Sequence, residues 1–136
     1  MRHVERLLIA YLLLKPFYLF GSGGLQIADL FLLTAFVLYI VLTKFNTDLK
    51  QQLTAAVKSN ALFMLFVAMT CMVNLTYFAY YGKYKFILSS LYFVFSFLAI
   101  VMFAMFCQKD DFLRKMSKAF KFGIVAQVAI YILGLG

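Results

Sequence analysis

Four polar side chains placed among apolar residues are the best candidates for chemistry in this sequence. Lys15 and Asp29 each lie a few residues inside a hydrophobic segment. Gln26 precedes Asp29 by three positions, and Asn74 lies within another apolar run. Ionisable groups in such surroundings usually face a protein interior or an aqueous cavity, and they are functional candidates by default. The sequence therefore predicts a substrate-binding site formed by Lys15, Gln26, Asp29 and Asn74.

The positions of Lys15 and Asp29 also predict an ion pair. A four-residue turn, 21–24 with the sequence GSGG, separates the two apolar segments that carry them. Two helices joined so tightly run antiparallel and touch, which brings the two charges to a similar depth. The alternative is that Lys15 extends along apolar surface toward lipid headgroups. Both interpretations stay open at the level of sequence.

The other reactive residue types lack the neighbours that catalysis needs. The one histidine, His3, lies in the N-terminal tail, and Cys71 and Cys107 lie in apolar runs, as is typical of small buried hydrophobic residues. The adjacent Asp110 and Asp111 favour a helix cap, because neighbouring side chains do not converge on one metal ion. The sequence contains no Ser-His-Asp or Cys-His arrangement, no P-loop and no zinc spacing. We therefore expect no metal and no cofactor.

The composition predicts an integral membrane protein. Of the 136 residues, 65% are hydrophobic and 13% are charged, whereas a soluble domain carries about 25% charged residues. Spanning segments should be helices, because backbone polar groups in lipid must be satisfied within the segment. The formal net charge of +8 then indicates basic loops at anionic lipid rather than nucleic-acid binding. The predicted fold class is an all-α, polytopic helical bundle in the membrane.

Five apolar runs predict about five transmembrane helices within a single domain, residues 1–136. The predicted spans are 4–20, 25–43, 61–81, 86–107 and 118–136. Pro16 predicts that the first regular helix ends near residue 15. Three of the spans carry polar or small residues at helical spacing, which predicts stripes that face other helices. These stripes are Thr70, Asn74, Tyr77 and Tyr81; Ser89, Tyr92 and Ser96; and Gly123, Gln127, Tyr131 and Gly134.

Two polar segments, 44–60 and 108–121, predict interfacial elements in the headgroup plane. In the first, apolar residues recur at spacings of three and four, which describes an amphipathic helix with Thr47 as a possible N-cap. Its apolar positions are Phe45, Leu49, Leu53, Ala56 and Val57. In the second, Asp110 or Asp111 is expected to cap a short helix that precedes a last span starting near Ser117.

Loop charges predict the orientation. Lysines and arginines number two in the N-terminal tail, three in 44–60 and five in 108–121, against two in the turn 82–85. Basic loops stay in the cytoplasm, so the N-terminus and both polar segments are predicted to be cytoplasmic. Lys15 and Asp29 then lie near the outer face.

The opening stretch carries a resemblance to a known family. It reads LLKPFYLFGSGGLQIADLFLLTAFVLYIVL, with the motif 15–18, the glycine turn and the motif 27–29 as its most specific features. It resembles the amino-terminal helices of bacterial O-antigen and exopolysaccharide polymerases, within the O-antigen ligase-like superfamily. The ending, VAQVAIYILGLG, is similar to a later helix of that family. The match covers the whole chain by hydrophobic pattern and the opening stretch by motif.

The resemblance implies a function. Members of the family have a cytoplasmic N-terminus and many more spans, and they transfer a glycan from an undecaprenyl-diphosphate carrier to an acceptor on the periplasmic side. The chain would then be the N-terminal membrane part of a polysaccharide polymerase in the bacterial cytoplasmic (inner) membrane, with an undecaprenyl-diphosphate-linked oligosaccharide as partner. The family's important arginines and histidines lie in large outer loops between later helices. Here Arg2, Arg6 and Arg114 are all predicted to be cytoplasmic, so we expect no activity from this chain alone.

Two other classes compete with that interpretation. One is a complete small multi-span carrier or accessory protein for lipid-linked sugar translocation, in which Asp29 and Asn74 line a polar groove. The other is a nonenzymatic membrane interaction protein. The last apolar run, 122–136, meets no further polar segment, which favours a chain that continues. The expected partners are membrane lipids and either a second copy of the chain or a missing C-terminal half, and no nucleic acid.

Overall fold

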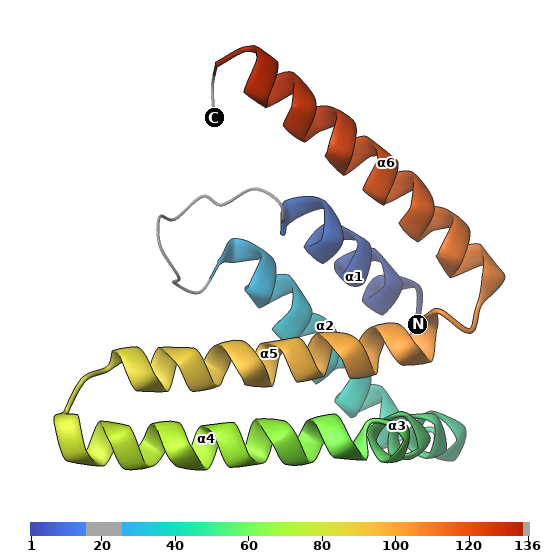
Figure 1. The fold of residues 1–136 in the computed structure, drawn as a ribbon. Helices are drawn as coiled ribbons and strands as arrows, with labels where there is room; N and C mark the ends of the chain where they lie inside the picture. Colours follow the sequence, from blue (N-terminus) through green and yellow to red (C-terminus); the bar gives the residue numbers. More distant parts are fainter. Residues whose placement is uncertain (16–25, 135–136) are drawn as a thin grey trace. The chain divides into compact units, whose positions relative to one another are not determined.

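The computed structural model describes residues 1–15 and 26–134, and these residues form helices and turns without a β-strand (Figure 1). This confirms the all-α fold class. The helices are α1 (Arg2–Leu14), α2 (Ile27–Thr43), α3 (Thr47–Ser59), α4 (Ala61–Tyr81), α5 (Lys85–Phe106) and α6 (Asp110–Ile132). The predicted turn 21–24 and the predicted end of the first span, 16–20, lie outside the described residues.

The chain divides into two compact units, which are described separately. One unit comprises Met1–Tyr39 and Phe106–Gly136, and so holds α1, most of α2 and α6. The other comprises Ile40–Met105 and holds α3, α4 and most of α5. The single domain expected from the sequence stays a prediction.

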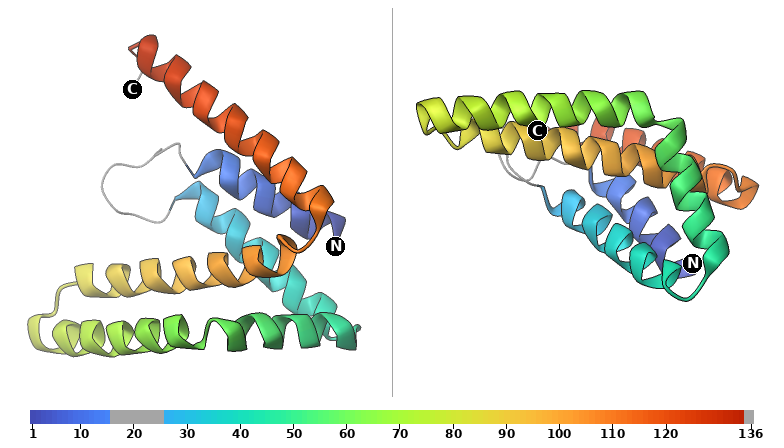
Figure 2. Two further views of the ribbon diagram at one scale, coloured as in Figure 1. Left: turned by 45° about the vertical axis from the view of Figure 1, so that its right-hand side comes forward. Right: turned by 90° about the horizontal axis from the view of Figure 1, so that it is seen from below.

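In the first unit, α1 packs along α6 (Figure 2). α1 buries Val4, Leu8 and Tyr11, whose spacing of four and three places them on one helical face. The helix ends at Leu14, and the backbone N–H of Lys15 donates to the Tyr11 carbonyl oxygen at 2.8 Å. The prediction that the regular helix ends near residue 15 is confirmed.

An aromatic cluster joins α2 to the start of α6 in the same unit. The ring of Tyr39 packs edge-on against Phe106, with 6.0 Å between the ring centroids. Phe106 in turn lies 5.5 Å from Phe112 of α6. All three side chains are almost fully buried, so this cluster is the centre of the unit's core.

α6 is one continuous helix, which corrects the expectation of a short interfacial helix followed by a separate span. Its N-cap is Lys109, with no side-chain cap bond, so neither aspartate caps the helix. The buried face consists of Phe112, Ala119 and Gly123. Beyond Gly123 the expected inward stripe is exposed in this unit, where Tyr131 is 82% exposed, and its contact with further helices stays a prediction. No proline interrupts 110–132, so the helix has no reason to break there.

In the second unit, α3 is the amphipathic helix that the sequence predicts. Its N-cap is Asn46 rather than Thr47, because the Asn46 side chain accepts hydrogen bonds from the backbone N–H groups of Asp48 and Leu49 at 2.9 and 3.4 Å. The expected apolar face is buried or half-buried from Leu49 onward. Phe45 is the exception, because it precedes the helix and is 85% exposed.

α4 and α5 form an antiparallel hairpin through the turn at Gly82. Gly82 adopts φ +64°, which a residue without a Cβ atom reaches at little cost. Ring contacts run along the hairpin from Phe63 and Phe97, at 6.2 Å, to Tyr77 and Phe86, at 5.4 Å. The bounds of α4 coincide with the predicted span, and α5 is shifted by one residue.

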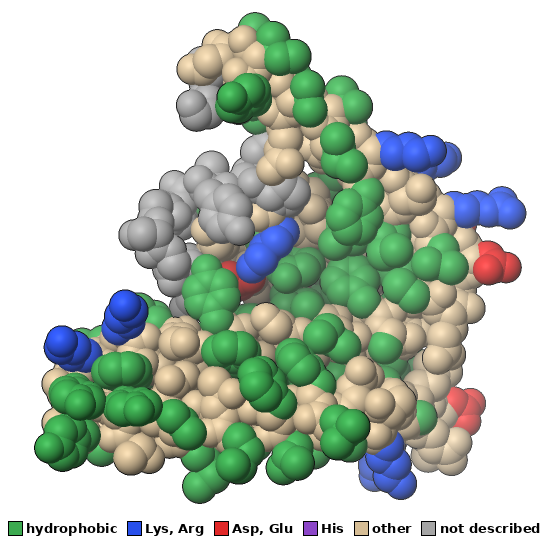
Figure 3. All heavy atoms as spheres, viewed as in Figure 1, with side chains coloured by type: hydrophobic (Ala, Val, Ile, Leu, Met, Phe, Trp, Pro, Cys, Tyr) green, Lys and Arg blue, Asp and Glu red, His purple; other side chains and the backbone are tan. Residues whose placement is uncertain are grey.

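These two helices have the length and composition of membrane spans, whereas the other helices among the described residues do not meet both conditions. Only 6% of the most apolar window of α4 and 11% of that of α5 is buried. Hydrophobic side chains accordingly cover the surface over this hairpin (Figure 3). A core helix of a soluble protein would be covered, so the hairpin supports membrane association. α2 is apolar but has 17 residues, and the five-span bundle stays a prediction.

Candidate functional site

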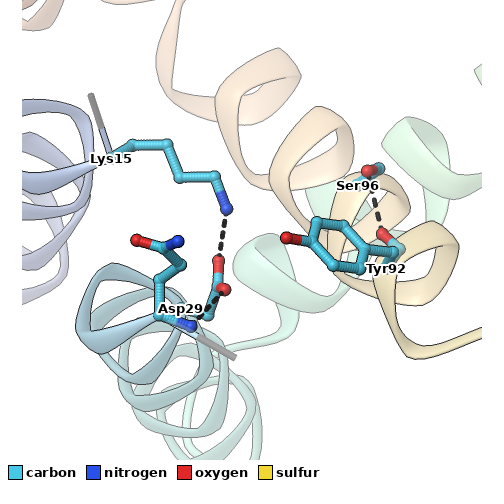
Figure 4. Close-up of polar contacts among 5 residues, drawn as sticks. Lys15, Asp29, Tyr92 and Ser96 are labelled. Carbon is cyan, nitrogen blue, oxygen red and sulfur yellow. Dashed lines mark hydrogen bonds and ion pairs between the residues drawn. The ribbon is translucent and has the colours of Figure 1, made fainter. Parts of the chain in front are cut away.

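The predicted ion pair between Lys15 and Asp29 is confirmed. The Lys15 Nζ atom lies 2.6 Å from Oδ1 of Asp29, across from the end of α1 to the start of α2 (Figure 4). The Asp29 side chain is 5% exposed and that of Lys15 is 33% exposed. The carboxylate is therefore enclosed, whereas the Lys15 side chain is partly accessible.

The start of α2 fixes the Asp29 carboxylate. Asp29 is the third residue of the helix, and its Oδ2 atom accepts a hydrogen bond from the backbone N–H of Gln26 at 3.0 Å. An acid at this position caps free N–H groups of the first turn and interacts favourably with the positive end of the helix dipole. One carboxylate oxygen thus serves the cap and the other serves Lys15, so the carboxylate cannot rotate without losing a partner.

The end of α1 positions Lys15. The residue is the C-cap of the helix, where a positive charge is favourable. Its Nζ atom also lies 5.5 Å from the centroid of the Tyr11 ring, within the range of a cation–π interaction. The ammonium group is held between a carboxylate and an aromatic face.

Gln26, whose backbone N–H donates to Asp29, also carries a buried side-chain amide. The residue is 2% exposed, and neither Oε1 nor Nε2 has a hydrogen-bond partner among the described residues. Leaving a buried polar group unsatisfied costs about 1–3 kcal/mol. Such a group is retained when something outside the described chain satisfies it, and a ligand is one such partner.

Asn74, the fourth predicted residue, lies half-buried on α4 in the other unit. Its part in the same site stays a prediction. Of its expected stripe, Thr70 donates its hydroxyl proton to the Phe66 carbonyl oxygen of its own helix at 2.9 Å. Tyr77 and Tyr81 are 47% and 55% exposed, so they do not face inward in this unit.

The last residue of the stripe expected on α5, Ser96, is exposed, as Tyr77 and Tyr81 are on α4. The exposed Ser96 donates to the Tyr92 carbonyl oxygen at 2.9 Å within the same helix (Figure 4). A serine hydroxyl that donates in this way keeps only its acceptor capacity for a ligand. Thr70, Thr76, Ser90 and Ser96 all donate to carbonyl oxygens of their own helix.

Sequence reasoning missed a second set of charges, at the N-terminal end of α1. Lys109 Nζ lies 3.4 Å from Oε1 of Glu5, and Lys115 pairs with Asp111 along α6. Lys115 beside it holds the pKa of Asp111 below its usual value. Glu5 and Lys109 are 104 positions apart, so no local pattern could have joined them. The basic content of 108–121 was the one signal available.

No family model matches the chain, and neither a curated protein nor a solved structure matches it. The part of the chain that the structure describes contains no group of three histidine, cysteine or acidic residues that could hold a metal ion.

Proposed function

We propose that this chain is the membrane-embedded N-terminal part of a polysaccharide polymerase-like glycan transferase that uses undecaprenyl-diphosphate-linked sugars. The observation that carries the proposal is the buried Gln26 amide, which has no hydrogen-bond partner among the described residues, on a residue whose backbone N–H contacts the Lys15–Asp29 ion pair. Such a combination offers a charged group and a neutral hydrogen-bonding group at the start of the apolar helix α2.

The chemistry of this site matches a lipid-linked sugar. The Lys15 side chain is partly accessible, and its ammonium group would donate a charge-assisted hydrogen bond to a diphosphate oxygen, which is a strong interaction. The Gln26 amide offers two donors and an acceptor, and a sugar hydroxyl both donates and accepts. A bound sugar would relieve the cost of the unpartnered amide, and this gain is unavailable to a lipid without a sugar.

The proposed arrangement in the membrane has five spans. Besides α4 and α5, the membrane would be crossed by the segments 4–20, 25–43 and 118–136. At 1.5 Å per residue the 17 residues of α2 extend for about 25 Å, so the ends must lie close to the headgroups of a core about 30 Å thick. With the N-terminus in the cytoplasm, the Lys15–Asp29 pair would lie near the periplasmic face of the inner membrane.

The test compares two lipids on the full chain in nanodiscs: undecaprenyl diphosphate alone and the same lipid bearing a disaccharide. The wild type should prefer the sugar-bearing lipid. Gln26→Leu should lose about tenfold of that preference, because each hydrogen bond contributes about 0.5–1.5 kcal/mol. Lys15→Ala should weaken both lipids alike, whereas Asp29→Ala should retain binding.

The matched control is Gln52→Leu, which makes the same change at an exposed position of α3. It should leave both affinities unchanged. Equal binding of the two lipids by the wild type, together with an unaltered Gln26→Leu variant, would show that this cluster does not bind a lipid-linked sugar.

A further inference from the structure

A second polar site lies at the opposite end of α1 from Lys15, in the same compact unit. There a groove of about 430 Å³ runs between α1 and α6. The residues that line it are Arg2, Glu5, Arg6, Ile9, Asp111 and Lys115. Its volume is within the range of sites for small molecules, about 300–1,000 Å³.

The charges of this groove do not cancel. Glu5 is paired with Lys109, and Asp111 is paired with Lys115. Both acids of the groove are therefore neutralised by lysines. Across residues 1–15 and 26–134, Arg2 and Arg6 have no acidic side chain at ion-pair distance.

The two arginines can act together. They are four positions apart on α1 and both are exposed, so they lie on one side of the helix. Each guanidinium group presents a planar set of donors that suits the oxygens of a phosphate group, often through two parallel hydrogen bonds. An anion held between them would meet no uncompensated carboxylate.

We propose that this groove binds the phosphate group of an anionic glycerophospholipid. The phosphate lies against Arg2 and Arg6, and the lipid's apolar part runs past Ile9, which is the apolar residue of the groove among those that the structure describes. Basic pockets between helices at a cytoplasmic membrane surface bind anionic headgroups in this way. A free phosphate ion could make the same polar contacts and would leave Ile9 unused. The proposal is independent of the sugar site at the other end of α1.

The experiment measures lipid selectivity of the full chain in phosphatidylcholine vesicles. Spin-labelled phosphatidylglycerol and phosphatidylcholine are compared, and the ratio of their association constants is read from the motionally restricted component of the spectrum. The wild type should prefer phosphatidylglycerol by about tenfold, and Arg2→Gln/Arg6→Gln should lose most of this preference. Arg2→Lys/Arg6→Lys should retain an intermediate preference, because it keeps the charge and loses the planar geometry.

Two arms decide what the preference means. The charge-matched control, Lys50→Gln/Lys58→Gln, removes two cations from α3 outside the groove and should keep the wild-type preference. An equal loss in this control would assign the selectivity to general surface charge and overturn the proposal.

Millimolar inorganic phosphate is then added to the wild type. Retained selectivity supports a lipid occupant, whereas complete loss of selectivity identifies free phosphate as the occupant and overturns the lipid assignment. Wild-type selectivity in the Arg2→Gln/Arg6→Gln variant overturns the site itself.

Discussion

In the unit formed by α1, α2 and α6, helices meet through a close backbone approach and ion pairs between helices. In the α4–α5 hairpin they meet through aromatic rings. The Cα atoms of α1 and α6 come within 8 Å of one another repeatedly, whereas those of α4 and α5 rarely do. The small residue Ala119 is buried on α6, and Phe66 packs edge-on against Phe93 in the hairpin, at 5.8 Å. Aromatic rings need more space between two helix axes than small side chains do.

The two regions also treat their polar groups differently. In the hairpin, hydroxyls such as those of Thr76 and Ser90 donate to carbonyl oxygens of their own helix. This satisfies them without any partner from outside, as lipid surroundings require. In the other unit, Lys15 reaches from one helix to the next, and the Gln26 amide has no hydrogen-bond partner in the part of the chain that the structure describes. The contrast agrees with the proposed function, in which the hairpin contacts lipid and the other unit binds the lipid-linked sugar.

The largest expected effect in a test of this comparison concerns the side of the membrane on which each end of α1 lies. Single cysteines at Ser22, Ser59 and Ser117, in a background lacking Cys71 and Cys107, would be treated with an impermeant thiol reagent on intact cells. Loop charge predicts labelling at position 22 alone, an all-or-none difference. The opposite pattern would put the arginine groove outside and remove the periplasmic sugar site.

The next largest effect concerns the aromatic core of the first unit. Phe106→Ala should lower the free energy of unfolding by about 3–5 kcal/mol, the usual range for a large side chain deleted from a packed core. Phe106 is 1% exposed and contacts both Tyr39 and Phe112. The measurement is unfolding by denaturant titration in detergent micelles.

Phe63→Ala in the hairpin is the matched control for Phe106→Ala. Phe63 is half-buried, and it makes ring contacts with Phe66 and Phe97. Detergent can replace part of what the ring loses, so we expect a cost of about 1 kcal/mol. Equal costs for the two alanine variants would show that the hairpin has a core of the same kind.

The Lys15–Asp29 pair should show a smaller effect. Removing one partner of a well-buried pair costs about 3–5 kcal/mol. Because the Lys15 side chain is 33% exposed, we expect about 2 kcal/mol for Lys15→Ala. Asp29→Ala should cost about 1 kcal/mol more than Lys15→Ala, since it also removes the contact to the Gln26 N–H. The double variant should recover part of the loss.

A double-mutant cycle on the same unfolding measurement checks this expectation. Strictly additive losses would mean that the two side chains do not interact in the membrane environment. The lysine would then be an anchor at the headgroups.

Much of the fold could be predicted from local pattern. The bounds of α4 follow from an apolar run between Asn60 and the turn at Gly82, and the Lys15–Asp29 pair was predicted from two opposite charges inside neighbouring apolar segments. The tyrosines made the stripe prediction unreliable. We counted each tyrosine as a polar residue that faces other helices, whereas its amphipathic ring is also favourable at a membrane–water interface. Tyr77 and Tyr81 are accordingly exposed at the turn end of the hairpin.

The remaining features depend on tertiary contacts that no spacing rule contains. The groove exists because α1 packs on α6. Glu5, which lines the groove, pairs with Lys109 although the two residues are 104 positions apart in the sequence. Whether the Gln26 amide finds a partner is also a tertiary question, because its position beside Asp29 in sequence leaves the amide free to bond elsewhere. The sequence predicts Gln26 as a site residue from its position alone. The structure adds the physical reason, which is a buried side-chain amide without a hydrogen-bond partner among the described residues.

The smallest expected effect lies on the exposed side of the arginine groove and concerns Asp111. The Lys115 side chain donates a hydrogen bond to this carboxylate and lowers its pKa below the usual value of 3.8. A pKa that is lower in the folded state means that the pair's stabilisation is fully present above the unfolded pKa, and that it is lost as the pH falls through the folded one. The pair should therefore matter above about pH 4 and weaken in stronger acid. In Lys115→Gln, the pKa of Asp111 measured by carboxyl-carbon NMR should rise toward 3.8, while Lys118→Gln, on the same helix, should leave it lowered. Because the carboxylate is exposed and screened by water, added salt should shrink the difference between the two variants. A salt-independent difference would mean that Asp111 is enclosed, for example by an occupant of the groove.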